Sequence, residues 1–271
     1  MIKRKEMTSE QMLDYLIEQL KAESEYSDAL LPQTFSLEEK QNLLRAFMNV
    51  RMPQIISEEF LHIQDLYLKQ RALEKGIVRG DELECITDNI CIWQGDITRL
   101  ETDAIVNAAN SGMLGCFVPL HNCIDNCIHT YAGIELRSEC EKKMKALKKL
   151  YGNDYEQPTA VPILTGAYNL PAKKIIHIVG PIVLGKLSGE HEELLCDCYR
   201  NCLNLCLKNN LKSIAFCCIS TGVFHFPAKR AATLAVKTVR NWLEDNPHVI
   251  DRVIFNVFRD EDKSYYEELL K

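Results

Sequence analysis

Hydrophobic residues in the first third of the chain recur with the period of amphipathic helices. In the segment 8–24 the apolar face consists of Met12, Leu13, Leu16, Ile17 and Leu20. Similar patterns occupy 36–52 and 57–75, and the first two segments each begin with a capping-box pair, a Ser or Thr followed three residues later by Gln or Glu. Pro53 and Gly76 stand where the second and third helices are expected to end. We therefore expect three consecutive helices, forming an N-terminal helical extension over residues 1–76.

After Gly76 the pattern changes to short runs rich in β-branched residues, separated by amphipathic segments. The strand-like runs are 90–97, 103–110, 160–169, 174–180, 213–220 and 252–258. The helix-like segments are 124–150, 190–210, 227–244 and 261–271. This alternation predicts a layered α/β domain over 77–271, with a largely buried sheet and a ligand site at the carboxyl ends of its strands.

Composition narrows the setting of the protein. A chain of 271 residues with 46% hydrophobic residues can bury a substantial core, and it contains no apolar run of the roughly 18 residues that span a bilayer. Twelve cysteines spread over a large chain without a secretory leader favour reduced thiols and a cytoplasmic location. The net charge of -6 and the lack of a basic stripe argue against extended nucleic acid as a partner.

A loop of small residues suited to an anion follows the run 213–220. It contains Ser220, Thr221 and Gly222 and leads to a helix whose first residue could be Pro227. A strand, a small-residue loop and a helix N-terminus together present backbone N–H groups to a diphosphate. An ordinary strand-to-helix turn is the alternative, and the loop alone does not decide between them.

A second group of polar residues lies near the run 90–97 and the run 103–110. Gly95 permits a close backbone approach, and Asp96 could accept a hydrogen bond from the exocyclic amine of adenine. The alternative for Asp96 is a helix cap or turn. Asn107 and Asn110 stand at the end of a strand, where their amides could hold ribose hydroxyls.

Four motifs in this order, "QGDIT", "VNAANS", "GAYNLPAKKIIHIVGP" and "ISTGVFHFP", resemble the macrodomain family of ADP-ribose readers and hydrolases from Asn89 to the C-terminus. The resemblance implies a macrodomain-like three-layer α/β/α sandwich with a six-stranded mixed sheet and an ADP-ribose cleft. On the matching positions, Asp96 would hold adenine and Asn110 would contact the distal ribose. The diphosphate would be cradled by Ile97 and by the loop of Ser220, Thr221, Gly222, Val223 and Phe224, with Phe224 against the distal ribose. His225 departs from the family pattern, in which a glycine is common.

The stretch "LGCFVPLHNCIDNCIH" stands where many macrodomains carry a glycine run. Cys116, His121 and Cys123 are close enough in sequence to converge on one ion, and two thiolates with one imidazole suit zinc. Three protein ligands would leave a fourth position open, as in catalytic zinc sites, so we expect one Zn²⁺ per chain. A chance cluster of reduced cysteines is the alternative. Other cysteines, Cys198, Cys202 and Cys206, share one helical face and are interpreted as core packing.

This insert also resembles a narrower subgroup, the zinc-containing bacterial macrodomains that occur with sirtuin-type ADP-ribosyltransferases. That resemblance implies removal of mono-ADP-ribose from modified protein side chains, acidic ones in particular, and a lipoyl-carrier protein as the substrate. Zinc would position and polarise the distal ribose or a water. Asp125 is the candidate general base, with Asn110 and Asn126 fixing hydroxyls, while a helix-capping role is the alternative for Asp125.

Two other functions share the same cleft. The protein could act on small O-acyl-ADP-ribose esters as a deacylase, or it could bind ADP-ribose without catalysis and use zinc as a structural clip. His129 is interpreted as a packing histidine with satisfied ring nitrogens and His177 as a structural residue of its strand. Trp93 is interpreted as a core residue, and stacking on adenine is the alternative.

Overall fold

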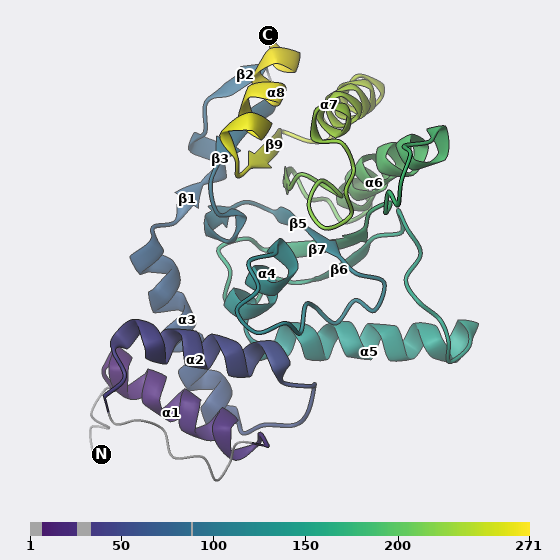
Figure 1. Ribbon diagram of the computed structural model, residues 1–271. Coiled ribbons are helices and arrows are strands. Elements are labelled where there is room, and N and C mark those ends of the chain that lie inside the picture. Colours follow the sequence, from purple (N-terminus) through teal and green to yellow (C-terminus); the bar gives the residue numbers. More distant parts are fainter. Residues whose placement is uncertain (1–6, 26–33, 88) are drawn as a thin grey trace.

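The computed structural model describes residues 7–25, 34–87 and 89–271, and it places one mixed sheet between two layers of helices (Figure 1). Parts of the predicted N-terminal extension, 1–6 and 26–33, lie outside the described residues. Among the described helices, none is long and apolar enough to cross a membrane.

The three N-terminal helices form where the sequence predicted them. They are α1 (Ser9–Ala22), α2 (Leu37–Val50) and α3 (Glu58–Lys75), capped by Thr8, Ser36 and Ser57. Both predicted capping boxes are present, which confirms the start of α1 and of α2. The helices share a core that also contains Ile134 from the sheet domain. The division of the chain at residue 76 therefore stays a prediction, because the extension packs directly on the sheet domain.

All six predicted runs form strands, and the sheet contains one more. The predicted strands are β3 (Ile90–Gln94), β5 (Ala104–Ala109), β6 (Ile163–Gly166), β7 (Lys174–Val179), β8 (Ser213–Phe216) and β9 (Arg252–Val257). The sheet order is β2-β3-β9-β8-β5-β7-β6, so the described sheet has seven strands rather than six. The extra strand, β2 (Cys85–Thr87), is three residues long and pairs antiparallel with β3 at the edge. Two shorter strands, β1 (Val78–Arg79) and β4 (Leu100–Glu101), pair separately.

Helices cover both faces of the sheet (Figure 1). α4 (Ile124–Ala132) and α5 (Ile134–Tyr151) lie against β5 and β6, while α6 (Gly189–Lys208), α7 (Ala228–Asp245) and α8 (Asp260–Leu270) form the other layer. The predicted helix 124–150 is broken at Gly133, whose φ of 104° favours glycine. The sequence predicted Pro227 as the first residue of a helix. In the structure Pro227 is the N-cap of α7, and the helix begins one residue later, at Ala228.

The parallel strands bring their carboxyl ends to one edge of the sheet. Five adjacent strands of the sheet are parallel to one another, in the order β3, β9, β8, β5 and β7. The segments that carry Asp96, Asn110 and Ser220 follow β3, β5 and β8 and therefore meet at this edge. The sheet topology thus assembles the candidate site from residues more than 100 positions apart.

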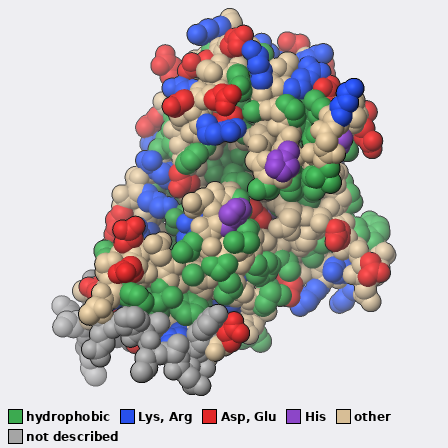
Figure 2. Space-filling model, in the orientation of Figure 1, with side chains coloured by type: hydrophobic (Ala, Val, Ile, Leu, Met, Phe, Trp, Pro, Cys, Tyr) green, Lys and Arg blue, Asp and Glu red, His purple; other side chains and the backbone are tan. Residues whose placement is uncertain are grey.

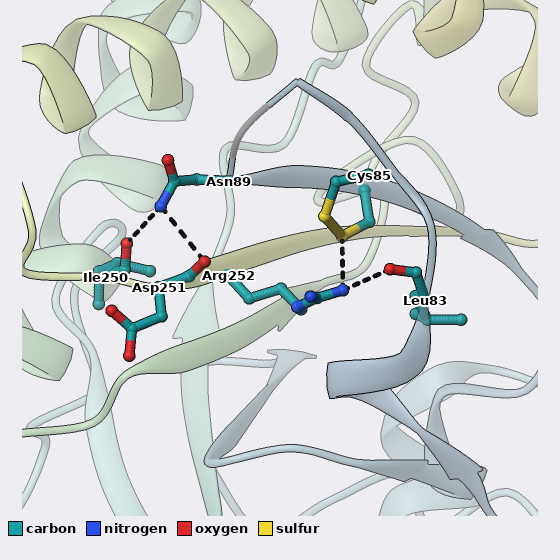
Figure 3. The surroundings of a disulfide bond; sticks show 7 residues. Leu83, Cys85, Asn89, Ile250, Asp251 and Arg252 are labelled. Carbon is teal, nitrogen blue, oxygen red and sulfur yellow. Dashed lines mark hydrogen bonds between the residues drawn. A yellow bond between two sulfur atoms is a disulfide. The ribbon is translucent and has the colours of Figure 1, made fainter.

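Ten of the twelve cysteines are free, and the remaining two form a disulfide. Cys85 and Cys91 face each other across β2 and β3, with their Cα atoms 4.0 Å apart (Figure 3). Arg252 donates to the carbonyl of Leu83 and lies 3.4 Å from the Cys91 sulfur. The expectation of reduced thiols throughout is therefore wrong for this pair, because strand pairing opposes two cysteines that the sequence pattern leaves unmatched.

Candidate active site

The carboxyl edge of the sheet is hollowed at its surface. Figure 2 shows a depression near the centre of this face, with hydrophobic side chains within it and histidines near its rim. A small buried cluster lies at this edge, made of Ala109, Met113, Met144 and Val179 with the half-buried Phe224 packed against it. Apolar walls around a few placed polar groups are the usual composition of a ligand pocket.

Asp96 takes the helix-cap role that the sequence left open, and its role toward adenine stays a prediction. It is the N-cap of the short helix η2 (Ile97–Arg99), and its Oδ1 accepts from the N–H of Thr98 at 3.0 Å and from the hydroxyl of Thr98 at 2.6 Å. Its Oδ2 lies 3.5 Å from the ammonium group of Lys75. The cap uses one carboxylate oxygen, so the other remains directed toward groups outside the turn.

The loop after β8 has the shape of an anion cradle. Ser220 and His225 adopt positive φ values of 66° and 58°, and the turn is closed by a hydrogen bond from the Phe226 N–H to the Ser220 carbonyl at 3.0 Å. Within the described structure, the N–H groups of Gly222, Val223 and Phe224 make no internal hydrogen bond. Three such donors in succession suit a diphosphate. The φ of His225 lies in the left-handed region, which a glycine adopts without strain.

Cys116, His121 and Cys123 converge, as their spacing predicts. Their ligand atoms all lie within 4.8 Å of one another, and Cys116 Sγ is 3.5 Å from His121 Nδ1. Zinc bonds of about 2.3 Å to sulfur and about 2.1 Å to nitrogen would put those two atoms about 3.6 Å apart in a tetrahedron, so the donor set fits zinc. We call residues 114–123, which form neither helix nor strand, the metal loop.

The last of these cysteines also begins α4. Cys123 is the N-cap, and its Sγ accepts from the N–H of Asn126 at 3.4 Å. Burial raises the pKa of the Cys123 thiol to about 12 despite that hydrogen bond, and repulsion from Cys116 adds to the rise. Since Cys123 occupies the cap, the alternative interpretation of Asp125 as a helix cap is wrong.

Asp125 is buried at the base of the site. Its Oδ1 accepts from Asn107 Nδ2 at 2.7 Å, and its Oδ2 accepts from Asn110 Nδ2 at 3.3 Å. Burial raises the pKa of Asp125 to about 6, although the hydrogen bond from Asn107 acts in the opposite direction. A carboxylate in such an environment has the properties of a general base working near neutral pH.

The three asparagines are placed differently from one another. Asn110 is exposed at the rim, where its side chain also accepts from the Gly112 N–H at 3.0 Å. Asn126 is fully buried, and its Nδ2 donates to the carbonyl of Val118 at 3.0 Å, so it holds the metal loop and the expectation that it fixes a substrate hydroxyl is wrong. Asn107 is also fully buried, and the expectation that it grips a ribose hydroxyl is wrong.

A second group, His129, Cys140 and His177, also has donor atoms close enough together to bind a metal. His177 is already engaged, however, at Nδ1 by Asn107 at 3.0 Å and at Nε2 by Thr165 at 2.9 Å. His129 makes no hydrogen bond within the described residues, which corrects its interpretation as a satisfied histidine. Burial lowers its pKa well below the ordinary value, so its 3.6 Å approach to Asp125 is not an ion pair. We therefore favour the metal loop as the metal site.

Comparison with known proteins identifies the family. The Macro domain family model matches residues 106–235. A protein-ADP-ribose hydrolase of Treponema medium is 45% identical over 97% of this chain and 100% of its own length, and one of Staphylococcus aureus is 42% identical over 95% and 94%. A mutant macrodomain of Oceanobacillus iheyensis, solved with ADPR, superimposes with a TM-score of 0.60 at 39% identity, covering 69% of this chain and 95% of that one.

The chain therefore belongs to the macrodomain family. The near-full-length relatives confirm the expectation of an enzyme, a hydrolase, and their coverage includes the N-terminal helices as well as the sheet domain. The expected three-layer fold with a mixed central sheet is confirmed by both the structure and the structural relative.

Proposed function

We propose that this protein is a zinc-dependent hydrolase that removes mono-ADP-ribose from modified protein side chains. The observation that carries the proposal is the convergence of Cys116, His121 and Cys123 within 4.8 Å, directly before the helix that bears the buried Asp125. Relatives over nearly the whole chain are named protein-ADP-ribose hydrolases, which supports the same activity here.

In this proposal the cleft binds ADP-ribose along its length. Asp96 holds adenine through Oδ2, the carboxylate oxygen that does not cap η2. Ile97 and the loop 220–224 cradle the diphosphate, the loop through the N–H groups of Gly222, Val223 and Phe224. Asn110 contacts the distal ribose at the rim, and Phe224 lies against that ribose. The structural relative solved with ADPR supports the choice of ligand.

One zinc ion per chain would be held by Cys116, His121 and Cys123. Bound there, zinc supplies polarisation of the distal ribose or of a water through its open fourth position. Asp125 orients a water that attacks the ester link between the distal ribose and the acidic side chain, and it takes up one proton of that water, which its buried environment favours at neutral pH. The ester C–O bond breaks, so the side chain leaves as a carboxylate and ADP-ribose keeps the hydroxyl. Asn110 restrains the carboxylate from the rim, and Asn126 keeps the metal loop against α4.

The substrate is proposed to carry ADP-ribose on an acidic side chain, and a lipoyl-carrier protein is the candidate. This choice is supported by the resemblance of the metal loop to the zinc-containing bacterial subgroup. A cytoplasmic setting is supported by the ten cysteines that remain free.

The deciding experiment pairs metal analysis with an activity assay. Elemental mass spectrometry of the purified protein is expected to give one zinc per chain, and release of ADP-ribose from a carboxylate-linked protein should stop on chelation and return with added zinc. Full release from metal-free protein would refute the zinc-dependent mechanism. Binding of ADP-ribose without release would identify a reader instead, and release from O-acetyl-ADP-ribose alone would identify a deacylase.

A further inference from the structure

We propose that the N-terminal helical extension is a structural part of the active centre, in which α2 holds the metal loop and the start of α4 through two positioning residues, Arg45 and Asn49. This inference rests on the proposed function of the site. It assigns to the extension a role that neither its sequence pattern nor the fold family requires. Figure 1 shows α2 lying beside α4, and the two helices are in contact.

Arg45 joins α2 to the metal loop and to the start of α4. Its Nη2 donates to the backbone carbonyl of His121 at 2.7 Å and to Asn126 Oδ1 at 2.9 Å, and its Nε lies 3.3 Å from the same oxygen. Asn126 in turn donates to the carbonyls of Val118 and Cys116. The guanidinium of Arg45 thus holds the backbone of His121, a proposed metal ligand, and the side-chain amide of Asn126, which holds the rest of the loop.

Asn49 makes a second connection one turn further along α2. It is 1% exposed; its Oδ1 accepts from the Leu120 N–H at 2.9 Å, and its Nδ2 donates to the hydroxyl of Thr130 at 2.9 Å. Leu120 has a positive φ of 58°, an uncommon conformation for a residue of this type. The Asn49 amide therefore holds the loop in this turn immediately before His121.

The C-terminal end of α2 is anchored to the same loop from a third direction. Arg137 of α5 donates to the carbonyl of Met48 at 3.1 Å and to the carbonyl of Arg51, and its Nε donates to the carbonyl of Leu114 at 2.8 Å. Within residues 114–123 the backbone makes one hydrogen bond to itself, from the His121 N–H to the Val118 carbonyl at 3.2 Å. Side chains of α2 and α5 supply further partners for this loop. Side chains that orient metal ligands in this way commonly change metal affinity 10- to 100-fold when removed.

The test compares Arg45→Met, Arg45→Lys and Asn49→Leu with a matched control, Lys40→Met. Lys40 lies on α2 but pairs with Glu10 and Asp14 of α1, so the control disturbs the extension without touching the loop. For each variant we would measure kcat for ADP-ribose release, the Kd for ADP-ribose, and the rate of zinc loss to a chelator. Thermal unfolding of each variant would establish that it is folded.

Arg45→Met and Asn49→Leu are expected to lower kcat by about 10- to 100-fold and to speed zinc loss by about 10-fold, with the Kd for ADP-ribose within about twofold of wild type. Arg45→Lys should lie between Arg45→Met and wild type, and Lys40→Met should keep the wild-type kcat. Wild-type kcat and zinc loss in folded Arg45 and Asn49 variants would overturn the proposal. If Arg45→Met does not fold, Arg45→Lys decides by the same measurements.

The two proposals can fail separately. If the wild-type protein contains no zinc or is insensitive to chelation, the zinc-dependent mechanism fails. The positioning role of Arg45 is then still decided by whether its variants lower kcat while leaving the Kd for ADP-ribose unchanged. If the wild-type protein binds zinc but releases no ADP-ribose, hydrolysis fails, and the rate of zinc loss decides the positioning role.

Discussion

Asn107 and Asp125 are joined by a 2.7 Å hydrogen bond in the interior of the protein, 18 residues apart in the chain. The Nδ2 group of Asn107 also lies 3.0 Å from His177 Nδ1, so the amide stands between the carboxylate and the imidazole. The strand β5 thereby sets the position of the carboxylate on α4. This contact makes Asp125 a rigid group whose loss can be measured separately from ligand binding.

Replacement of Asp125 by Asn should remove the proposed base and keep the shape of the site. We expect Asp125→Asn to lower kcat for ADP-ribose release by about 100-fold or more, the usual contribution of a positioned acid or base, with the Kd for ADP-ribose within a few-fold of wild type. Single-turnover release and calorimetric binding would measure the two quantities. Wild-type turnover in Asp125→Asn would exclude Asp125 as the base, and a large loss of affinity would place Asp125 in ligand binding instead.

Loss of one thiolate should separate metal binding from ADP-ribose binding. We expect Cys116→Ala to lose zinc and to lower ADP-ribose release by about 100-fold or more, while Asp96 and the loop 220–224 keep most of the affinity for ADP-ribose. Cys196→Ala is the matched control, because Cys196 is a free, half-buried cysteine in α6. Metal content, release and binding would be measured in parallel. A Cys116→Ala protein that is zinc-free and fully active would contradict a catalytic metal.

A methyl group on Gly180 should displace the loop that precedes α7. A Cβ at Gly180 would lie 2.1 Å from Ser220 Oγ and 2.8 Å from Ile219 Cγ2, so that loop must move. Overpacking of this kind costs about 1–3 kcal/mol, and we expect Gly180→Ala to weaken ADP-ribose binding about 10-fold. Gly189→Ala is the control, since no atom lies within 4 Å of its Cβ position. Equal Kd values for the two variants would argue that Ser220 does not shape the ligand site.

Local patterns predicted most of the fold. The caps of α1, α2 and α3 and the six main strands follow from side-chain period and from residues close in sequence. The edge strand β2 and the Cys85–Cys91 disulfide could not be predicted in this way. A three-residue strand has no measurable side-chain period, and its register depends on β3.

The site was predicted to a lesser extent, for a physical reason. The spacing of Cys116, His121 and Cys123 signals convergence, because a short loop can bring these donors together. Arg45 and Asn49 give no such signal, because polar residues on an amphipathic helix usually face solvent, and the contacts that define them lie 71–82 residues away. Asn107 was assigned to the ligand because its strand was expected to end near it, whereas β5 continues to Ala109 and buries it.

Two buried histidines should make the folded protein sensitive to acid. Burial lowers the pKa of His177 to about 4 and lowers the pKa of His129 well below its ordinary value. An unfolded chain binds a proton at each histidine below about pH 6.5, whereas folded His177 does so only near pH 4. The free energy of unfolding is therefore highest above pH 6.5, where His177 is neutral in both the folded and the unfolded chain. It falls as the pH is lowered toward 4, by on the order of 3 kcal/mol from His177.

His177→Gln removes this titration and keeps an acceptor and a donor for Asn107 and Thr165. We expect the variant to be less stable than wild type at pH 7, and the difference in the free energy of unfolding to shrink between pH 6.5 and 4, because only the wild-type chain gains this proton on unfolding. Urea unfolding at several pH values would measure the difference, with His62→Gln on the exposed side of α3 as the control. A difference between wild type and His177→Gln that stays constant over this range would show that His177 titrates alike in the folded and unfolded states.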